Sequence, residues 1–145
     1  GKIISTIEGV DIVPLDGDFP IIKSNIKLNQ IPYKVVAEIS TGQFFAVKEK
    51  RTSPVFKIGN TYYEKGSIPR VYTTIANTTR SVISNIPVRV LLYDINSNVF
   101  GVGETIIKSL DKEEQKTLTF TWDEPFQTEP IKIRVYPIIN PFISY

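Results

Sequence analysis

Cysteine, methionine and histidine are all absent from this chain of 145 residues. The absence of cysteine excludes disulfides and thiol nucleophiles. Without histidine as well, the usual zinc ligand sets and the Ser-His-Asp and Cys-His catalytic arrangements are excluded too. Neighbouring carboxylates such as Glu113 and Glu114 alternate faces if they lie on a strand, so they do not form a catalytic pair. We therefore predict no enzymatic activity and no cofactor.

Leucine and alanine are scarce, with six and three residues, so the chain has little material for helices. In their place stand 22 isoleucines, 13 valines and 13 threonines, which makes 48 β-branched residues. Such side chains lose rotamer freedom on a helix and pack well on a pleated sheet. The composition therefore predicts an all-β protein.

No charge of one sign dominates the chain. The 17 basic and 15 acidic residues leave a net charge of +2, far from the strong basic field that nucleic acid attracts. No run of 18 apolar residues is present, so we expect no membrane span. The lack of cysteine and methionine suits an oxidising exterior, and the chain begins at Gly1 rather than methionine. We therefore expect an extracellular or cell-surface protein, exported with a removed signal sequence.

Apolar and polar residues alternate along much of the chain, which is typical of strands with one buried face. The Gly59-Asn60 pair predicts a tight hairpin, and Trp122 is expected in the core, with a sugar-stacking platform as the alternative. Together the pattern predicts about nine or ten short strands in an antiparallel sandwich or barrel. The predicted strands lie near residues 22–28, 33–39, 44–48, 55–58, 61–63, 71–75, 88–92, 102–106, 118–122 and 131–135.

Residues 1–13 form an apolar arm, which the breaker run Pro-Leu-Asp-Gly-Asp at 14–18 separates from the rest. This predicts an arm and linker over residues 1–18 and a β-sandwich over 19–145. The arm is either the first strand of its own sandwich or a donor strand that completes the sheet of a neighbouring copy. Its candidate interface side chains are Ile3, Ile4, Ile7, Val10, Ile12 and Val13.

Residues 66–137 resemble the CARDB type of immunoglobulin-like domain, named for cell-adhesion-related bacterial proteins. The resemblance is carried by residues 71–78 (VYTTIANT), 84–94 (SNIPVRVLLYD), 109–110 with 117–122 (SL and TLTFTW) and 131–137 (IKIRVYP). The Leu92-Tyr93-Asp94 run is also similar to the FxLYD surface domains. Where the family usually has a glycine turn, this chain has residues 111–114 (DKEE), so a differently shaped turn is expected.

This resemblance implies an immunoglobulin-like antiparallel β-sandwich on a surface or secreted protein, used as a spacer, adhesion or docking module. It implies no catalytic or cofactor residues. We expect a subunit of an extracellular filament, such as a pilus or thread, which self-associates into a homopolymer by strand addition of its arm. The alternative is a monomeric adhesion or carbohydrate- or protein-binding module of a larger surface protein, with surface glycans as partners.

Three polar motifs are candidates for other sites. Asn77-Thr78-Thr79 is an N-glycosylation sequon, so Asn77 is a candidate glycan acceptor. Asp16 and Asp18 offer hard oxygen ligands for calcium, with a solvated turn as the simpler interpretation. Residues 94–98 begin like a calcium loop but lack its glycine and its bidentate glutamate, which favours a plain hairpin connection.

Overall fold

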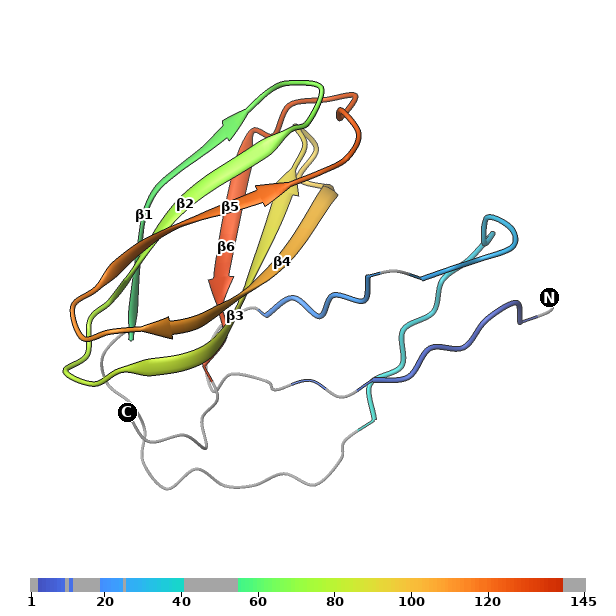
Figure 1. The fold of residues 1–145 in the computed structure, drawn as a ribbon. Coiled ribbons are helices and arrows are strands. Elements are labelled where there is room, and N and C mark those ends of the chain that lie inside the picture. Colours follow the sequence, from blue (N-terminus) through green and yellow to red (C-terminus); the bar gives the residue numbers. More distant parts are fainter. Residues whose placement is uncertain (1–2, 10, 12–18, 25, 41–54, 140–145) are drawn as a thin grey trace.

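Six β-strands and no helix make up the regular structure of the part of the chain that is described, residues 3–9, 11, 19–24, 26–40 and 55–139. This computed structural model confirms the all-β prediction (Figure 1). Its strands are β1 (Phe56–Glu64), β2 (Arg70–Asn77), β3 (Ile83–Tyr93), β4 (Val99–Leu110), β5 (Gln115–Thr121) and β6 (Lys132–Pro137).

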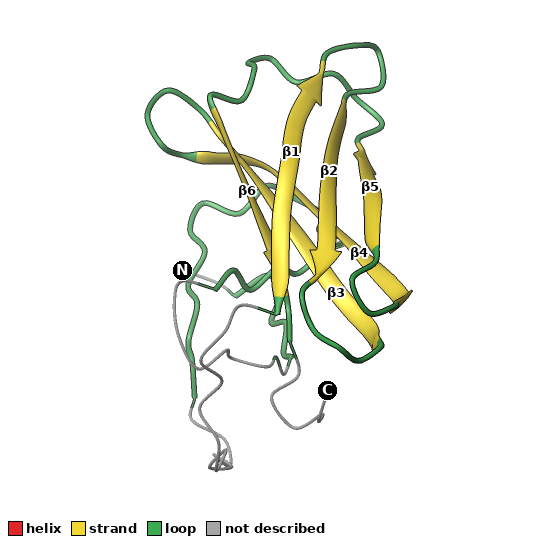
Figure 2. Cartoon of the chain, turned by 90° about the vertical axis from the view of Figure 1, so that its left-hand side faces the viewer, coloured by secondary structure: helices red, strands yellow, loops and turns green. Residues whose placement is uncertain are grey.

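The strands form two antiparallel sheets of three, ordered β1-β2-β5 and β4-β3-β6. The two sheets lie face to face, and the chain changes sheet between β2 and β3, between β4 and β5, and between β5 and β6 (Figure 2). This is an immunoglobulin-like β-sandwich, as predicted. A two-layer arrangement of this kind buries the inward face of every strand and leaves the other face free for contacts outside the core.

The core lies between the central strands β2 and β3. Val71 and Ile75 from β2 meet Val88, Val90 and Leu92 from β3, and all five side chains are fully buried. The alternation in the sequence predicted these faces correctly. Each such side chain contributes roughly 1.5–3 kcal/mol on burial, so the two central strands supply most of the stabilisation.

The predicted hairpin at Gly59-Asn60 is wrong, because β1 runs through these residues without turning. Gly59 pairs with Thr74 and Tyr62 with Tyr72, so the extra residues between them form a β-bulge. Asn60 has φ 32°, and the hydroxyls of Thr61 and Thr73 lie 2.7 Å apart across the bulge. The Gly59-Asn60 pair therefore forms part of a β-bulge and not a turn.

The predicted apolar face of β4 is also wrong. Val102 and Ile106 are largely exposed, and Glu104 lies on their outward face rather than interrupting a core face. The inward positions include Gly101 and Gly103. A Cβ on either glycine would press on core side chains at 2.8–3.1 Å, so these positions admit only glycine without rearrangement.

The strands predicted at 22–28 and 33–39 are not present in the described residues, because neither segment has a hydrogen-bonded partner strand. The predicted strand at 44–48 lies outside the described residues. Two of the ten predicted strands lack a ladder, one lies outside the described residues, and the two predicted at 55–58 and 61–63 are parts of β1, which leaves six described strands.

Asn77 is the last residue of β2, and its side chain hydrogen-bonds to the turn that follows. Its side chain is buried, and Nδ2 lies within hydrogen-bond distance of the carbonyls of Ser81, Leu110 and Asp111 at 2.8–3.2 Å. Its Oδ1 accepts hydrogen bonds from the backbone N–H and the hydroxyl of Thr79. A glycan on Nδ2 would have to displace these bonds, so this geometry argues against Asn77 as a glycan acceptor.

The substitution Asn77→Ala should lower the free energy of unfolding by about 2–4 kcal/mol, because it leaves buried carbonyls without donors. The control Asn96→Ala, in the exposed turn after β3, should change it by less than about 0.5 kcal/mol. Urea unfolding followed by tryptophan fluorescence measures both. Equal stabilities of the two variants would contradict the structural role of Asn77.

Candidate assembly surface

Arg89 occupies the outward face of the central strand β3, yet its side chain is only 9% exposed. Its Nε–H donates to Glu104 on the neighbouring strand β4 at 2.6 Å. Its other nitrogens reach back to the N-terminal segment. One donates to the carbonyl of Pro20 at 2.8 Å, and another lies 2.8 Å from the carboxylate of Asp11. We call this group, with Phe19, the Arg89 clamp.

The clamp holds the N-terminal segment on the sandwich. The Arg89 guanidinium lies 5.1 Å from the centre of the Phe19 ring, a cation–π contact. Burial lowers the pKa of Arg89, but the hydrogen bonds to Glu104 and Asp11 outweigh burial and raise the pKa above its ordinary value. Asp11 therefore forms an ion pair with Arg89. The candidate calcium ligands Asp16 and Asp18 lie outside the described residues.

The sequence analysis did not identify Arg89 as a functional residue. A signal was available, since Arg89 is the one charge among the apolar residues 86–92, and Glu104 is the one acid in residues 99–110. Pairing them requires the register of β3 with β4, in which Arg89 lies directly opposite Glu104. The alternation alone does not supply that register.

The predicted arm is apolar, extended and unpaired where it is described. Residues 3–9 have no regular secondary structure, and Ile3, Ile4 and Ile7 are exposed. The other candidate interface residues, Val10, Ile12 and Val13, lie outside the described residues. Within the described part, then, the arm is not the first strand of its own sandwich.

A second apolar segment, residues 31–39, is exposed to a greater degree. Ile31, Tyr33, Val35 and Ile39 share one face of an extended chain, and they are 79–105% exposed. Isolated exposed apolar residues are ordinary, but a contiguous run marks an interaction surface. Residues 3–9 and 31–39 together form what we call the N-terminal apolar segments.

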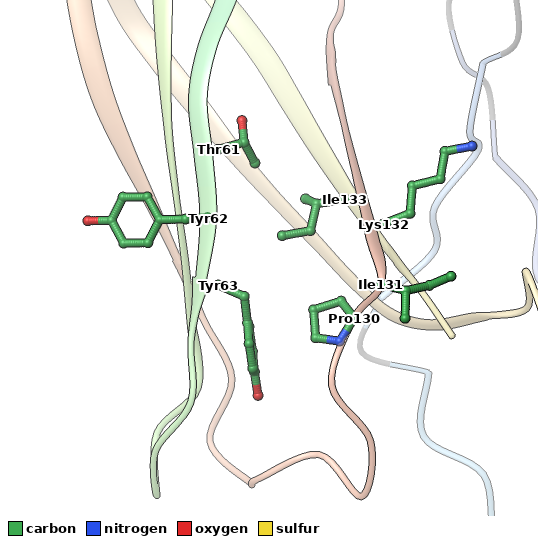
Figure 3. Close-up of a pocket in the computed structure, with 7 residues that line it drawn as sticks. All are labelled: Thr61, Tyr62, Tyr63, Pro130, Ile131, Lys132 and Ile133. Atoms are coloured by element: carbon green, nitrogen blue, oxygen red, sulfur yellow. The ribbon is translucent and has the colours of Figure 1, made fainter. Parts of the chain in front are cut away.

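A hollow of about 290 Å³ separates the edge strands β1 and β6. Figure 3 shows Thr61 and Tyr63 on β1, with Ile133 on β6 pointing toward β1, whereas Tyr62 and Lys132 point away from the gap. Ile131, at the start of this edge, is 60% exposed. The hollow is therefore lined by both polar and apolar groups and is accessible from solvent.

One end of the hollow carries an exposed ion pair, in which Lys65 Nζ lies 2.8 Å from Glu129 Oε1. Burial raises the pKa of the nearby Tyr63 phenol, Glu129 raises it further, and Lys65 lowers it. Tyr63 thus stays a neutral hydrogen-bonding group at neutral pH.

The opposite edge of the sandwich is closed. The indole N–H of Trp122 donates to the carbonyl of Val102 on β4 at 2.9 Å, which joins the two sheets. Trp122 and Phe100 each pack edge-on against Phe126, with ring centres 5.3 and 5.1 Å apart. Trp122 therefore belongs to the core margin, as predicted. The two margins differ: among the described residues, Trp122 bridges the sheets at the β4/β5 margin, whereas the β1/β6 margin has a hollow.

The remaining candidates do not assemble into a chemical centre. Residues 94–98 form the expected turn, with Asp94 Oδ1 accepting the backbone N–H groups of Asn96 and Asn98. Among the described residues, no cluster of three or more acidic side chains is positioned to hold a metal ion. No helix in the same residues is long and apolar enough to cross a membrane.

Comparison with known proteins gives little further guidance. No protein family and no curated protein sequence matches the chain. The chain is similar to a crystal structure of a DUF1425 family member from Shewanella sp. PV-4, with 16% sequence identity and a TM-score of 0.46. That similarity covers 62% of this chain and 81% of the other. The resemblance to CARDB domains stays a prediction.

The variant Arg89→Met should release the N-terminal segment while keeping the apolar stem of the side chain. We expect faster amide hydrogen exchange in residues 19–24 and a loss of about 1–3 kcal/mol in the free energy of unfolding, because Asp11 and Glu104 lose their partner. The control Arg70→Met breaks the exposed ion pair with Glu64 and should change stability by less than about 1 kcal/mol. Unchanged exchange in residues 19–24 would contradict the clamp.

Proposed function

We propose that this protein is a non-enzymatic extracellular structural protein whose copies associate into a filament by strand addition. The N-terminal apolar segments, which are residues 3–9 of the predicted arm and residues 31–39, supply the added strand. A sheet edge of the next copy receives it. The observation that carries the proposal is the exposure of these segments beside a folded sandwich that does not use them as strands.

The energetic argument concerns residues 31–39 most clearly. Side chains such as Ile31 and Val35 contribute roughly 1.5–3 kcal/mol each when they leave water. Residues 31–39 also have backbone groups with no ladder partner in the described chain. Adding the segment to an open sheet edge would bury its apolar face and pair its backbone at the same time.

The geometry of the contact favours a polymer over a closed pair. The donor lies in the N-terminal region and the acceptor lies on the sandwich, so the contact joins two different surfaces. Head-to-tail contacts of this kind repeat from copy to copy, and they form open filaments unless the rotation closes a ring. The Arg89 clamp supports regular repetition, because it fixes where the N-terminal region leaves each sandwich.

A second candidate is the carbohydrate-binding or adhesion module. Tyr62 and Tyr72 stack on the outward face of β1 and β2, with their ring centres 5.0 Å apart. The Tyr62 side chain is 56% exposed. An exposed aromatic face of this kind suits sugar stacking. Trp122 does not contribute to it, because it lies at the core margin. We favour the filament because the apolar segments cover far more surface than this stack.

We expect the full-length chain to form regular filaments visible by negative-stain electron microscopy. The double variant Ile4→Lys, Val35→Lys should abolish them, because it places a charge on both N-terminal apolar segments without touching the core. The control Ile95→Lys, Asn96→Lys adds the same charge in the exposed turn after β3 and should leave the filaments intact.

Dispersed particles of the full-length chain at high concentration would contradict the proposal. The glycan-binding alternative would then be tested with Tyr62→Ala in a glycan array. Circular dichroism of every variant should match that of the unaltered chain, because all four substituted positions lie outside the six strands.

A further inference from the structure

The outer edge of β6 has no neighbour among the described strands. β6 pairs with β3 alone, along Val88–Tyr93. In a seven-stranded immunoglobulin sandwich the second sheet runs C-F-G. Here β3 and β6 take the places of C and F, and no described strand takes the place of G. The edge is therefore open for backbone hydrogen bonding.

The hollow behind this edge fits the inward face of an added strand. A strand lying beside β6 would face the gap toward β1, where Thr61, Tyr63 and Ile133 line the hollow. Every second side chain of the added strand would enter the hollow. The strand would also bury part of the exposed Ile131 side chain. At the opposite edge, the Trp122 hydrogen bond to Val102 already occupies the corresponding position.

Residues 31–39 match this groove better than residues 3–9 do. Their odd-numbered positions are Ile, Tyr, Val, Ala and Ile, which gives one continuous apolar face. The even-numbered positions 34, 36 and 38 would face outward, as Lys132 and Arg134 of β6 do, which allows Glu38 to pair with a basic side chain. Residues 3–9 lack a clean alternation, since Ile3 and Ile4 are adjacent.

A second copy is the source of the strand. Figure 1 shows residues 26–40, in blue to cyan, running out to one side of the sandwich and then turning back, without lying in the gap between β1 and β6. The Arg89 clamp holds the start of this extension on the outer face of β3. Within the described residues, each copy therefore has both an unfilled groove and an apolar segment without a ladder partner, and exchange between copies would satisfy both.

We infer that residues 31–39 of one copy add to the free edge of β6 in the next copy and fill the β1/β6 hollow. The inference rests on the proposed function and specifies which segment inserts and which edge receives it.

Disulfide mapping tests this pairing, and the absence of native cysteine makes it clean. Chains with Val36→Cys are mixed with chains with Lys132→Cys, assembled and oxidised. Lys34→Cys and Glu38→Cys repeat the test in the other registers. Because a disulfide requires Cα atoms within about 7 Å, we expect a linked dimer in at least one register. Ser5→Cys on the arm and Lys108→Cys on β4 serve as controls and should not link.

The failures are distinguishable. Absence of filaments would overturn the proposed function and the inference with it. Filaments in which Ser5→Cys links to Lys132→Cys would overturn the choice of segment, and linkage to Lys108→Cys would overturn the choice of edge. Filaments in which no introduced cysteine links to residue 132 would contradict the assignment of the β6 edge and the β1/β6 hollow as the receiving site. Linkage only within one chain, in a Val36→Cys, Lys132→Cys double variant, would show that each copy fills its own groove.

A second test needs no cross-link. Ile131→Lys places a charge at the mouth of the hollow, and Ile95→Lys places the same charge in the exposed turn after β3. Both isoleucines are exposed, so neither change should affect folding. We expect Ile131→Lys to raise the protein concentration required for assembly and Ile95→Lys to leave it unchanged. An equal effect of the two variants would contradict the groove.

Discussion

The buried guanidinium of Arg89 is the interaction on which the arrangement of this chain depends. A charge on the outer face of a central strand is costly unless it is paired, and here the partners come from two regions. Glu104 belongs to the sandwich, whereas Asp11 and Pro20 belong to the N-terminal segment. The Arg89 charge therefore holds the N-terminal segment on the sandwich. Its hydrogen bonds fix the position of that segment more closely than non-directional apolar contacts would.

The sandwich itself is stabilised from the centre outward. The centre of the core consists of five fully buried side chains, Val71, Ile75, Val88, Val90 and Leu92. The two margins of the sandwich differ in how their side chains pack. One margin is sealed by Trp122 and its aromatic neighbours, which the glycines of β4 admit at close range. The other margin keeps an accessible hollow beside β6, whose outer edge has no neighbour among the described strands. Sheets usually protect their edges, so an open edge and an unpaired apolar segment in one chain point to exchange between copies.

Much of the fold could be predicted from the sequence. The β-branched composition predicts the all-β class, and alternation predicts the inward faces of β2, β3 and β5, because period two survives any register. The failures have a common cause. At Gly59-Asn60, on β4 and over residues 22–39, the outcome depends on which strand lies alongside, and one chain's alternation does not specify its partner. Arg89 and the β1/β6 hollow were missed for the same reason, since both arise from register between strands.

The central claim is that residues 31–39 become part of a sheet only when copies meet. Amide hydrogen exchange of this segment, followed by mass spectrometry across a range of protein concentrations, tests it most directly. The account predicts fast exchange in dilute protein and strong protection once copies associate, because the segment's backbone groups then enter a ladder. Fast exchange at every concentration, or protection already present in the dilute monomer, would contradict it.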